Sequence, residues 1–307
     1  MGWSYPPYPQ PPVIYVAKID TLKGISTYTV GLVLDILFSI LSLIIGLSGL
    51  YIVSTVPTSG YYSEAYFFGA AVCGAFAILI IVFVISFIIS LSSLFAMKGG
   101  ATEFGPEHEQ SVNRAFIYKW LGTCMSATAV GLTVFFLIAG YGSFTFGGPS
   151  PYAFLPLVVS VCWAAGVTFK AMTYQGMARQ IAPPSERDRL RIGLIAVMLA
   201  GIGSIVVVGL GTVRALALFV EQNPEPASLA LMGATASVFL APGFSVIGYV
   251  LFLVAYRTTG KALREGAVRP QPYAARPPSI SPYQAGSQQF AMSPQVYQDL
   301  NRGPPPP

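Results

Sequence analysis

The amino-acid sequence predicts an all-α, polytopic membrane protein, with six transmembrane helices in a compact bundle and disordered tails rich in proline and tyrosine. Of the 307 residues, 54% are hydrophobic and only 9% are charged, whereas soluble domains carry about 25% charged residues. The apolar runs exceed the roughly 20 residues that a helix needs to cross about 30 Å of hydrocarbon. They do not alternate as the strands of a membrane barrel do, so helices are the predicted spanning elements.

Six apolar segments reach spanning length, and together they predict a membrane domain over residues 26–256. The predicted spans are 26–55, 66–97, 115–140, 152–172, 192–220 and 228–256. A tail rich in proline and tyrosine precedes them over residues 1–25, and a basic, proline-rich tail follows over residues 257–307. No segment in the first 25 residues has the continuous apolar core of a cleavable signal peptide.

The basic residues lie on one side of this predicted domain. Sixteen of the 17 lysines and arginines fall in the tails and in the second and fourth loops with their flanks, and Arg214 is the exception. The loops 56–65, 141–151 and 221–227 contain none. Because basic loops stay in the cytoplasm, both termini are predicted to be cytoplasmic in a cell membrane. This orientation requires an even number of spans and agrees with six.

Fifteen of the 25 prolines lie in the two tails, where they prevent helices and accompany too little aliphatic bulk for a core. Both tails are therefore predicted to be disordered, with polyproline II character. In the N-terminal tail, tyrosines alternate with prolines at PxxP spacing, which is typical of a docking strip for a cytoplasmic protein partner. A solvated tail without a dedicated partner is the alternative. The candidate docking residues are Tyr5, Pro6, Tyr8, Pro9 and Pro12.

A short amphipathic segment connects this tail to the first span. In residues 13–23, Tyr15, Ile19 and Leu22 share one helical face, and Lys18 and Lys23 flank it. Lysines beside an apolar face are typical of helices that lie against lipid headgroups. The segment therefore predicts an interfacial helix, with the lipid bilayer as its partner.

Few residues are suited to catalysis or to metal binding. The three cysteines lie in apolar runs without a CxxC pair, which argues against a disulfide framework and against a zinc site. His108 is the only histidine, and the side chains of residues 107–109 diverge on a helix. HExxH, GxSxG and Walker A patterns are missing. We therefore expect that the protein is not an enzyme and that it binds no cofactor and no metal. We also expect no nucleic acid as a partner, because the basic residues of a membrane protein indicate its orientation.

Two opposite charges lie inside predicted spans and are candidate functional residues. Asp35 lies in the inner third of the first span, and Arg214 lies in the outer third of the fifth. Charges within the membrane are costly and are typical of substrate and ion pathways. Their depths differ by about 15 Å at 1.5 Å per residue, which argues against direct pairing. Lys170, at the inner end of the fourth span, is expected to snorkel toward the cytoplasm.

Arg214 has a structural alternative to a pathway role. Glu221 lies on the same helical face, two turns nearer the outer surface. The guanidinium can therefore extend outward toward Glu221 or toward the lipid headgroups, where its cost is lower than at the centre of a span. Structural anchoring and a role in transport both remain open for this residue.

Pro242 and Gly243, in the stretch FLAPGFS, fall at the midpoint of the sixth span. Proline has no N–H, so the carbonyl of Val238 loses its helical donor, and Gly243 is expected to add flexibility. Transporters expose backbone groups to substrates at such interrupted helices. A structural kink is the alternative, because neighbouring groups often re-satisfy the freed carbonyl.

Small residues recur four apart within several spans, and such spacing permits close contact between helices. The pattern predicts a compact bundle. It also predicts a homo-oligomer in which helix faces lined by small residues meet between copies of the chain. The residues are the pairs Ala70–Gly74, Gly122–Ser126 and Ala127–Gly131, together with Gly201, Gly203, Gly209 and Gly211 in the fifth span.

Three stretches carry a resemblance to known sequences: KIDTLKGIS before the first span, GPEHEQSVNRAF before the third and VLFLVAYRTTGKAL at the end of the sixth. With the span layout, they resemble uncharacterised multipass membrane proteins of thermophilic archaea, over residues 18–264. The resemblance implies a multipass helical fold, and it implies no activity and no functional residues.

Two hypotheses about function follow from the sequence. The first is a non-catalytic membrane protein that binds partners through its tails, as a scaffold does. The alternative is a transporter of a small solute or ion that uses Asp35, Arg214 and the helix break at Pro242.

Overall fold

The computed structural model describes residues 19–55, 62–136 and 151–268, and in these ranges every regular element is a helix. The long helices are α1 (Ile19–Thr55), α2 (Tyr62–Gly100), α3 (Pro106–Phe135), α5 (Leu155–Ala178), α6 (Pro184–Val220) and α9 (Val246–Arg264). The shorter ones are α7 (Pro224–Ser237) and α8 (Leu240–Phe244), with the 3-10 turns η1 (Ala101–Phe104) and η4 (Pro151–Phe154). The all-α class predicted from the sequence is confirmed.

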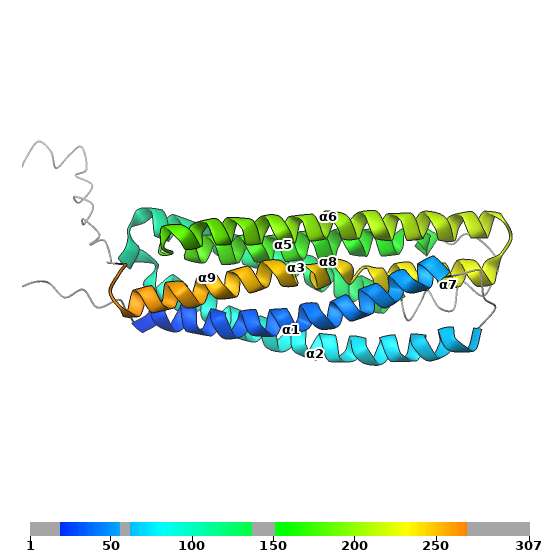
Figure 1. The fold of residues 1–307 in the computed structure, drawn as a ribbon, viewed down its shortest axis with the longest axis horizontal. Coiled ribbons are helices and arrows are strands. Elements are labelled where there is room, and N and C mark those ends of the chain that lie inside the picture. The colour runs from blue at the N-terminus through cyan, green and yellow to red at the C-terminus, as the bar shows by residue number, and fades with distance from the viewer. Residues whose placement is uncertain (1–18, 56–61, 137–150, 269–307) are drawn as a thin grey trace, which may run out of the picture. The chain divides into compact units, whose positions relative to one another are not determined.

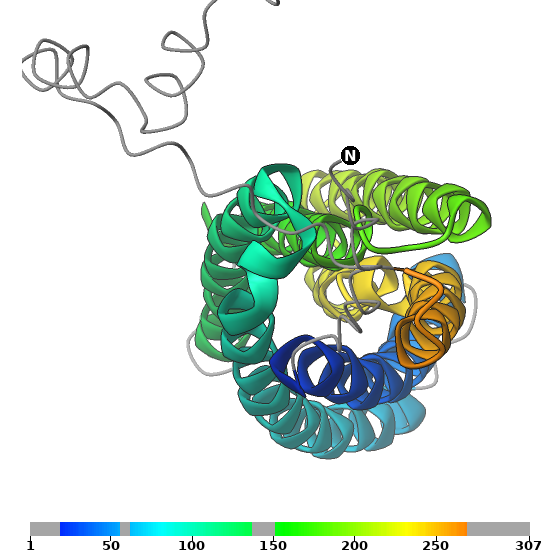
Figure 2. The same ribbon diagram turned by 90° about the vertical axis from the view of Figure 1, so that its left-hand side faces the viewer.

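The long helices run side by side along one common direction (Figure 1). Helix α3 packs against α5, and α5 packs against α6. Helix α1 packs against α2. The chain from α7 to α9 lies between α6 and α1 and contacts both of them, as the end-on view in Figure 2 shows. This segment therefore joins the helices α3, α5 and α6 to the pair of α1 and α2.

Five helical stretches in the described residues are long and apolar enough to cross a membrane. They are Asp20–Thr55, Ala77–Phe104, Leu155–Ala178, Pro184–Val220 and Pro226–Arg264. These stretches coincide with the first, second, fourth, fifth and sixth spans predicted from the sequence. Large apolar side chains such as Leu199 and Leu210 are more than 60% exposed on the outside of the bundle. The protein is therefore a polytopic helical membrane protein whose outer surface is suited to lipid.

Prolines mark where several of the helices begin. Helix α3 begins at Pro106, directly after Gly105, whose φ of 88° lies in the region that favours glycine. Helices α6 and α7 likewise begin at a proline. Helix α1 already begins at Ile19, so the described part of the expected interfacial segment belongs to the first long helix and is not a separate element.

The sixth predicted span is interrupted, as the sequence predicts. Helix α7 ends at Ser237, α8 covers only Leu240–Phe244, and α9 begins at Val246. Pro242 and Gly243 are both buried in α8. A Cβ atom on Gly243 would lie 2.7 Å from the Cα atom of Leu43. The glycine therefore permits close contact with α1, and the expectation that it adds flexibility stays a prediction.

Glycines hold α1 and α7 at backbone contact. A Cβ atom on Gly49 would lie 2.6 Å from the carbonyl oxygen of Gly233, and one on Gly233 would lie 2.8 Å from the carbonyl oxygen of Gly49. Of the small residues singled out in the sequence, Gly122 packs in the same way against Gly166 of α5. In contrast, a Cβ atom on Gly74, Gly131 or Gly203 would meet no atom within 4 Å in the described chain.

We predict that Gly49→Ala lowers the thermal unfolding midpoint of the purified protein in detergent. The added methyl group meets backbone atoms that cannot rotate away, and overpacking of this kind costs about 1–3 kcal/mol. Gly203→Ala is the matched control, because its methyl group enters open space and alanine favours a helix over glycine by about 0.5–1 kcal/mol. Equal midpoints for the two variants would contradict the close contact between α1 and α7.

Candidate functional site

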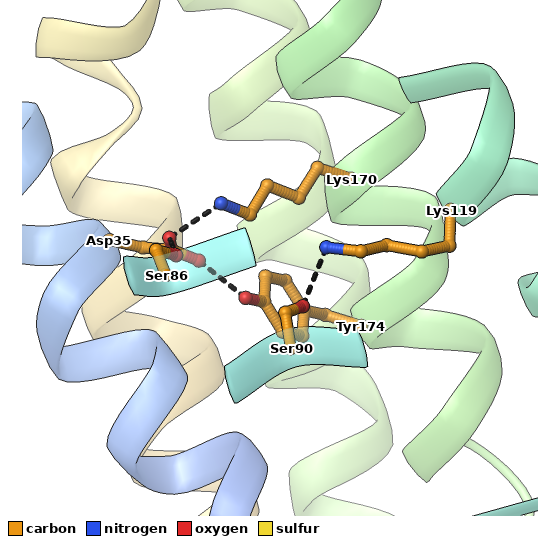
Figure 3. Close-up of polar contacts among 6 residues, drawn as sticks. All are labelled: Asp35, Ser86, Ser90, Lys119, Lys170 and Tyr174. Atoms are coloured by element: carbon orange, nitrogen blue, oxygen red, sulfur yellow. Dashed lines mark hydrogen bonds and ion pairs between the residues drawn. The ribbon is translucent and has the colours of Figure 1, made fainter. Parts of the chain in front are cut away.

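Asp35 of α1 is the centre of a buried polar cluster. Its side chain is 1% exposed, and three side chains from two other helices donate hydrogen bonds to it (Figure 3). The Lys170 ammonium on α5 lies 2.5 Å from Oδ1, and the Ser86 hydroxyl on α2 lies 2.5 Å from the same oxygen. The Tyr174 hydroxyl on α5 donates to Oδ2. The carboxylate therefore ties α1 to both α2 and α5.

Lys170 is the counter-ion of Asp35, which corrects the expectation that this lysine snorkels toward the cytoplasm. Its side chain is 21% exposed, and its ammonium also lies 6.0 Å from the centre of the Tyr249 ring. Arg214, the other cation considered as a partner, is not among the side chains that bond to Asp35. The sequence did contain a signal for the pair, because Asp35 and Lys170 both fall in the cytoplasmic half of their predicted spans.

Lys119 of α3 adds a second buried ammonium beside this pair. It is 5% exposed and donates a hydrogen bond of 2.6 Å to the Ser90 hydroxyl on α2. Figure 3 shows the side chains of Lys119 and Lys170 extending in the same general direction, from α3 and α5 toward Asp35 and the two serines. Lys119 is one of the 16 basic residues from which the sequence predicts the orientation in the membrane. The sequence does not indicate that its side chain is buried. Among the described residues, no carboxylate lies within 4.0 Å of its ammonium.

Four tyrosines pack against the cluster from α1, α5 and α9. The ring of Tyr174 makes edge contacts with Tyr28, Tyr249 and Tyr256, with centroids 5.6, 6.2 and 6.0 Å apart. The Tyr256 hydroxyl also donates a hydrogen bond of 2.8 Å to the carbonyl of Tyr174. These contacts hold Tyr174, whose hydroxyl bonds to Asp35, in place. The tyrosine contacts depend on three helices, so the sequence alone did not indicate them.

A small cavity separates the two lysines. Its volume is ≈ 20 Å³, and it lies where α2, α3 and α5 meet. A cavity of this size accommodates about one water molecule. The lining residues are Phe83, Phe87, Lys119, Gly122, Thr123, Ser126 and Lys170.

The remaining candidates from the sequence lie apart from this cluster. Arg214 is half-buried on α6. Gly243 contacts α1 at Leu43, about 12 Å along the helix from Asp35 at 1.5 Å per residue, and Pro242 is buried next to it in α8. Of the candidate transport residues, the structure therefore places Asp35 in the buried cluster with Lys170. The docking residues Tyr5, Pro6, Tyr8, Pro9 and Pro12 lie outside the described residues.

His108 occupies a different buried position, in the first turn of α3 and outside the predicted spans. Its ring stands edge-on to Phe104 with centroids 5.5 Å apart, and in the described chain neither ring nitrogen has a hydrogen-bond partner. Burial lowers the pKa of His108 to about 4. The imidazole lines a cleft of ≈ 660 Å³ with Glu107 and Arg187. In the ranges that the structure describes, no group of three His, Cys, Asp or Glu side chains is placed to hold a metal ion.

No family model matches the chain, and no curated protein and no solved structure matches it significantly. The resemblance to membrane proteins of thermophilic archaea therefore stays a prediction.

We predict that Lys170→Met destabilises the protein by about 3–5 kcal/mol, because the Asp35 carboxylate is left buried without its cation. The double variant Asp35→Asn with Lys170→Met should be more stable than Lys170→Met alone, since it removes the orphaned charge. Thermal unfolding of the wild type, the two single variants and the double variant in detergent gives the coupling free energy between the two residues. Lys261→Met is the control, because this lysine is 76% exposed and lies 3.8 Å from Glu265; about 1 kcal/mol or less is expected.

We predict that stability falls as the pH is lowered from 6.5 toward 4. The folded chain keeps His108 neutral down to about pH 4, whereas the unfolded chain takes up a proton near pH 6.5. The unfolded state therefore binds more protons throughout this window, and the full loss amounts to about 3 kcal/mol. His108 is the only histidine, so His108→Phe should be nearly insensitive to pH between 6.5 and 5. Parallel melting curves for the two proteins would contradict the burial of a neutral imidazole.

Proposed function

We propose that this integral membrane protein transports a small solute or ion and that protonation of Asp35 is coupled to the movement. The proposal includes the topology predicted from the sequence: six spans, with both termini in the cytoplasm of the cell. Five helical stretches of spanning length support it. In this proposal the sixth span is α3, which covers most of the predicted span 115–140 and is not one of those five stretches. The concentration of lysine and arginine on one side supports the orientation.

The single observation that carries the proposal is the burial of Asp35 with Lys170 among spanning helices. Each charge costs about 2.5–3.5 kcal/mol at the centre of a span on insertion scales. Apolar residues of similar volume often hold helices together as well as a buried ion pair does. A carboxylate and an ammonium in this position are therefore more typical of an ion or proton pathway than of a structural contact alone.

The contacts of Asp35 suggest how coupling would work. Protonation of the carboxylate removes the charge that holds the Lys170 ammonium, and with it the strongest link between α1 and α5. The interrupted segment from α7 to α9 contacts α1 along its length, and short helices joined by breaks permit rigid pieces to move relative to each other. Proton uptake at Asp35 would thus bias a movement of α1 against α5.

The partner-binding hypothesis is the second candidate, and the sequence of the tails favours it. The PxxP spacing of Pro6, Pro9 and Pro12 is of the kind that aromatic grooves bind. A second copy of the chain is a further proposed partner, because Gly131 and Gly203 have space for a close neighbour. Deletion of residues 1–12 and 268–307 tests the docking strip: co-purifying cytoplasmic partners should be lost, and their retention would contradict it.

We predict that proteoliposomes containing the protein take up a small solute in response to a pH gradient and that Asp35→Asn abolishes this response. A panel of amino acids, sugars, inorganic anions and metal cations identifies the solute class. Asp188→Asn is the matched control, because Asp188 is an exposed aspartate on α6 and its variant should retain uptake. Lys170→Met should lose the dependence on the pH gradient, since the coupled pair is gone.

Two results would contradict the transport proposal. One is the lack of uptake of every solute class by the wild-type protein when it is folded in the vesicles. The other is uptake that persists unchanged in Asp35→Asn. Arg214→Gln separates the two roles considered for Arg214, because a change in uptake indicates a pathway role and a change in melting temperature alone indicates anchoring.

A further inference from the structure

We propose that the cavity between Lys119 and Lys170 binds a monatomic anion of the halide class. This site shares Lys170 with the Asp35–Lys170 pair, but equilibrium binding of an anion does not require that the protein transports anything. Three features carry the inference: the charge of the cluster, the hydrogen-bond donors that remain at the two ammonium groups, and the size of the cavity.

With Asp35, Lys170 and Lys119 all ionised, the cluster contains one more cation than anions. Asp35 is the only carboxylate that bonds to it in the described chain, and Lys170 already compensates that charge at 2.5 Å. The Lys119 ammonium is 5% exposed, and its hydrogen-bond partner is the uncharged Ser90. An uncompensated charge inside a membrane protein is strongly disfavoured. A single bound anion between the two lysines makes the cluster neutral.

Donors for such an anion are present at the cavity. An ammonium group has three N–H bonds, and the structure gives one hydrogen bond to the ammonium of Lys119 and one to that of Lys170. The remaining N–H groups of both lysines are therefore available where these side chains line the cavity. The Thr123 hydroxyl is not a further donor, because it already donates to the carbonyl of Lys119.

The size and the walls of the cavity select the class of anion. A volume of ≈ 20 Å³ holds one water-sized particle, so polyatomic anions such as sulfate and phosphate are too large. Phe83 and Phe87 of α2 form an apolar wall. Two ammonium groups repel any cation. Chloride and bromide meet these conditions.

The test is an equilibrium titration of the purified full-length protein in detergent, with sodium gluconate as the starting salt. Chloride or bromide replaces gluconate at constant ionic strength, and the thermal midpoint and the broadening of the chloride NMR line are followed. We expect halide to raise the midpoint of the wild-type protein and to broaden its chloride line. Sulfate in place of gluconate should have no effect, because it exceeds the cavity.

Two variants change the charge of the cluster in opposite directions. Lys119→Gln removes the extra cation while it keeps a polar group near Ser90, so it should weaken halide binding by about tenfold or more, which corresponds to about 1.4 kcal/mol. Asp35→Asn adds one unit of positive charge and should strengthen binding. Lys261→Met, which changes an exposed lysine, should bind halide as the wild type does.

Either of two results overturns the inference. If halide leaves the wild-type protein unchanged, the cavity holds water and Lys119 is uncharged. If Lys119→Gln responds to halide as strongly as the wild type, the anion binds elsewhere. Since the titration uses no membrane and no gradient, a failure of the transport proposal does not affect its outcome.

Discussion

The ion pair between Asp35 and Lys170 is the interaction on which the arrangement of the bundle depends most. A carboxylate that is 1% exposed is tolerated in an apolar environment only when its charge is matched and its oxygens accept hydrogen bonds. Lys170, Ser86 and Tyr174 meet both conditions, and they come from α2 and α5. The requirements of one side chain therefore determine how three helices face one another.

Backbone contact organises the other end of α1. There Gly49 and Gly233 bring α1 and α7 together without intervening side chains, and Gly243 does the same where α8 meets Leu43. Such contacts gain their stability from close packing, because lipid provides no hydrophobic driving force between helices. Helix α1 thus has a polar attachment to α5 in its first half and a glycine-based attachment to α7 and α8 in its second half. This division leaves the polar cluster as the part of the interface that responds to charge.

The two lysines give this cluster a character that differs from an isolated ion pair. Lys119 and Lys170 approach a common cavity from α3 and α5, while a single carboxylate faces them from α1. The electrostatic balance of the interior is consequently sensitive to one proton or to one small ion. His108 lies outside this cluster in the first turn of α3, where its imidazole stands edge-on to Phe104.

The sequence by itself determined the class of the protein. The low content of charge and the length of the apolar runs are enough to predict spanning helices, because the cost of exposing polar backbone to lipid leaves few other structures. The break near Pro242 and the start of α3 at Pro106 were also predictable, since proline lacks an N–H and its effect is local. Asp35 was recognised as unusual because any buried charge in a span is unusual.

The tertiary structure alone decided which residues meet. Lys170 and Lys119 lie near predicted loops, where lysines usually reach water, and only the packing of α3 and α5 against α1 and α2 turns them inward. The four tyrosines and Gly49 likewise acquire their roles from neighbours far away in the sequence. The local sequence shows that a charge lies within a span and is costly there. The counter-ion of that charge depends on the order and rotation of the helices, which long-range contacts decide.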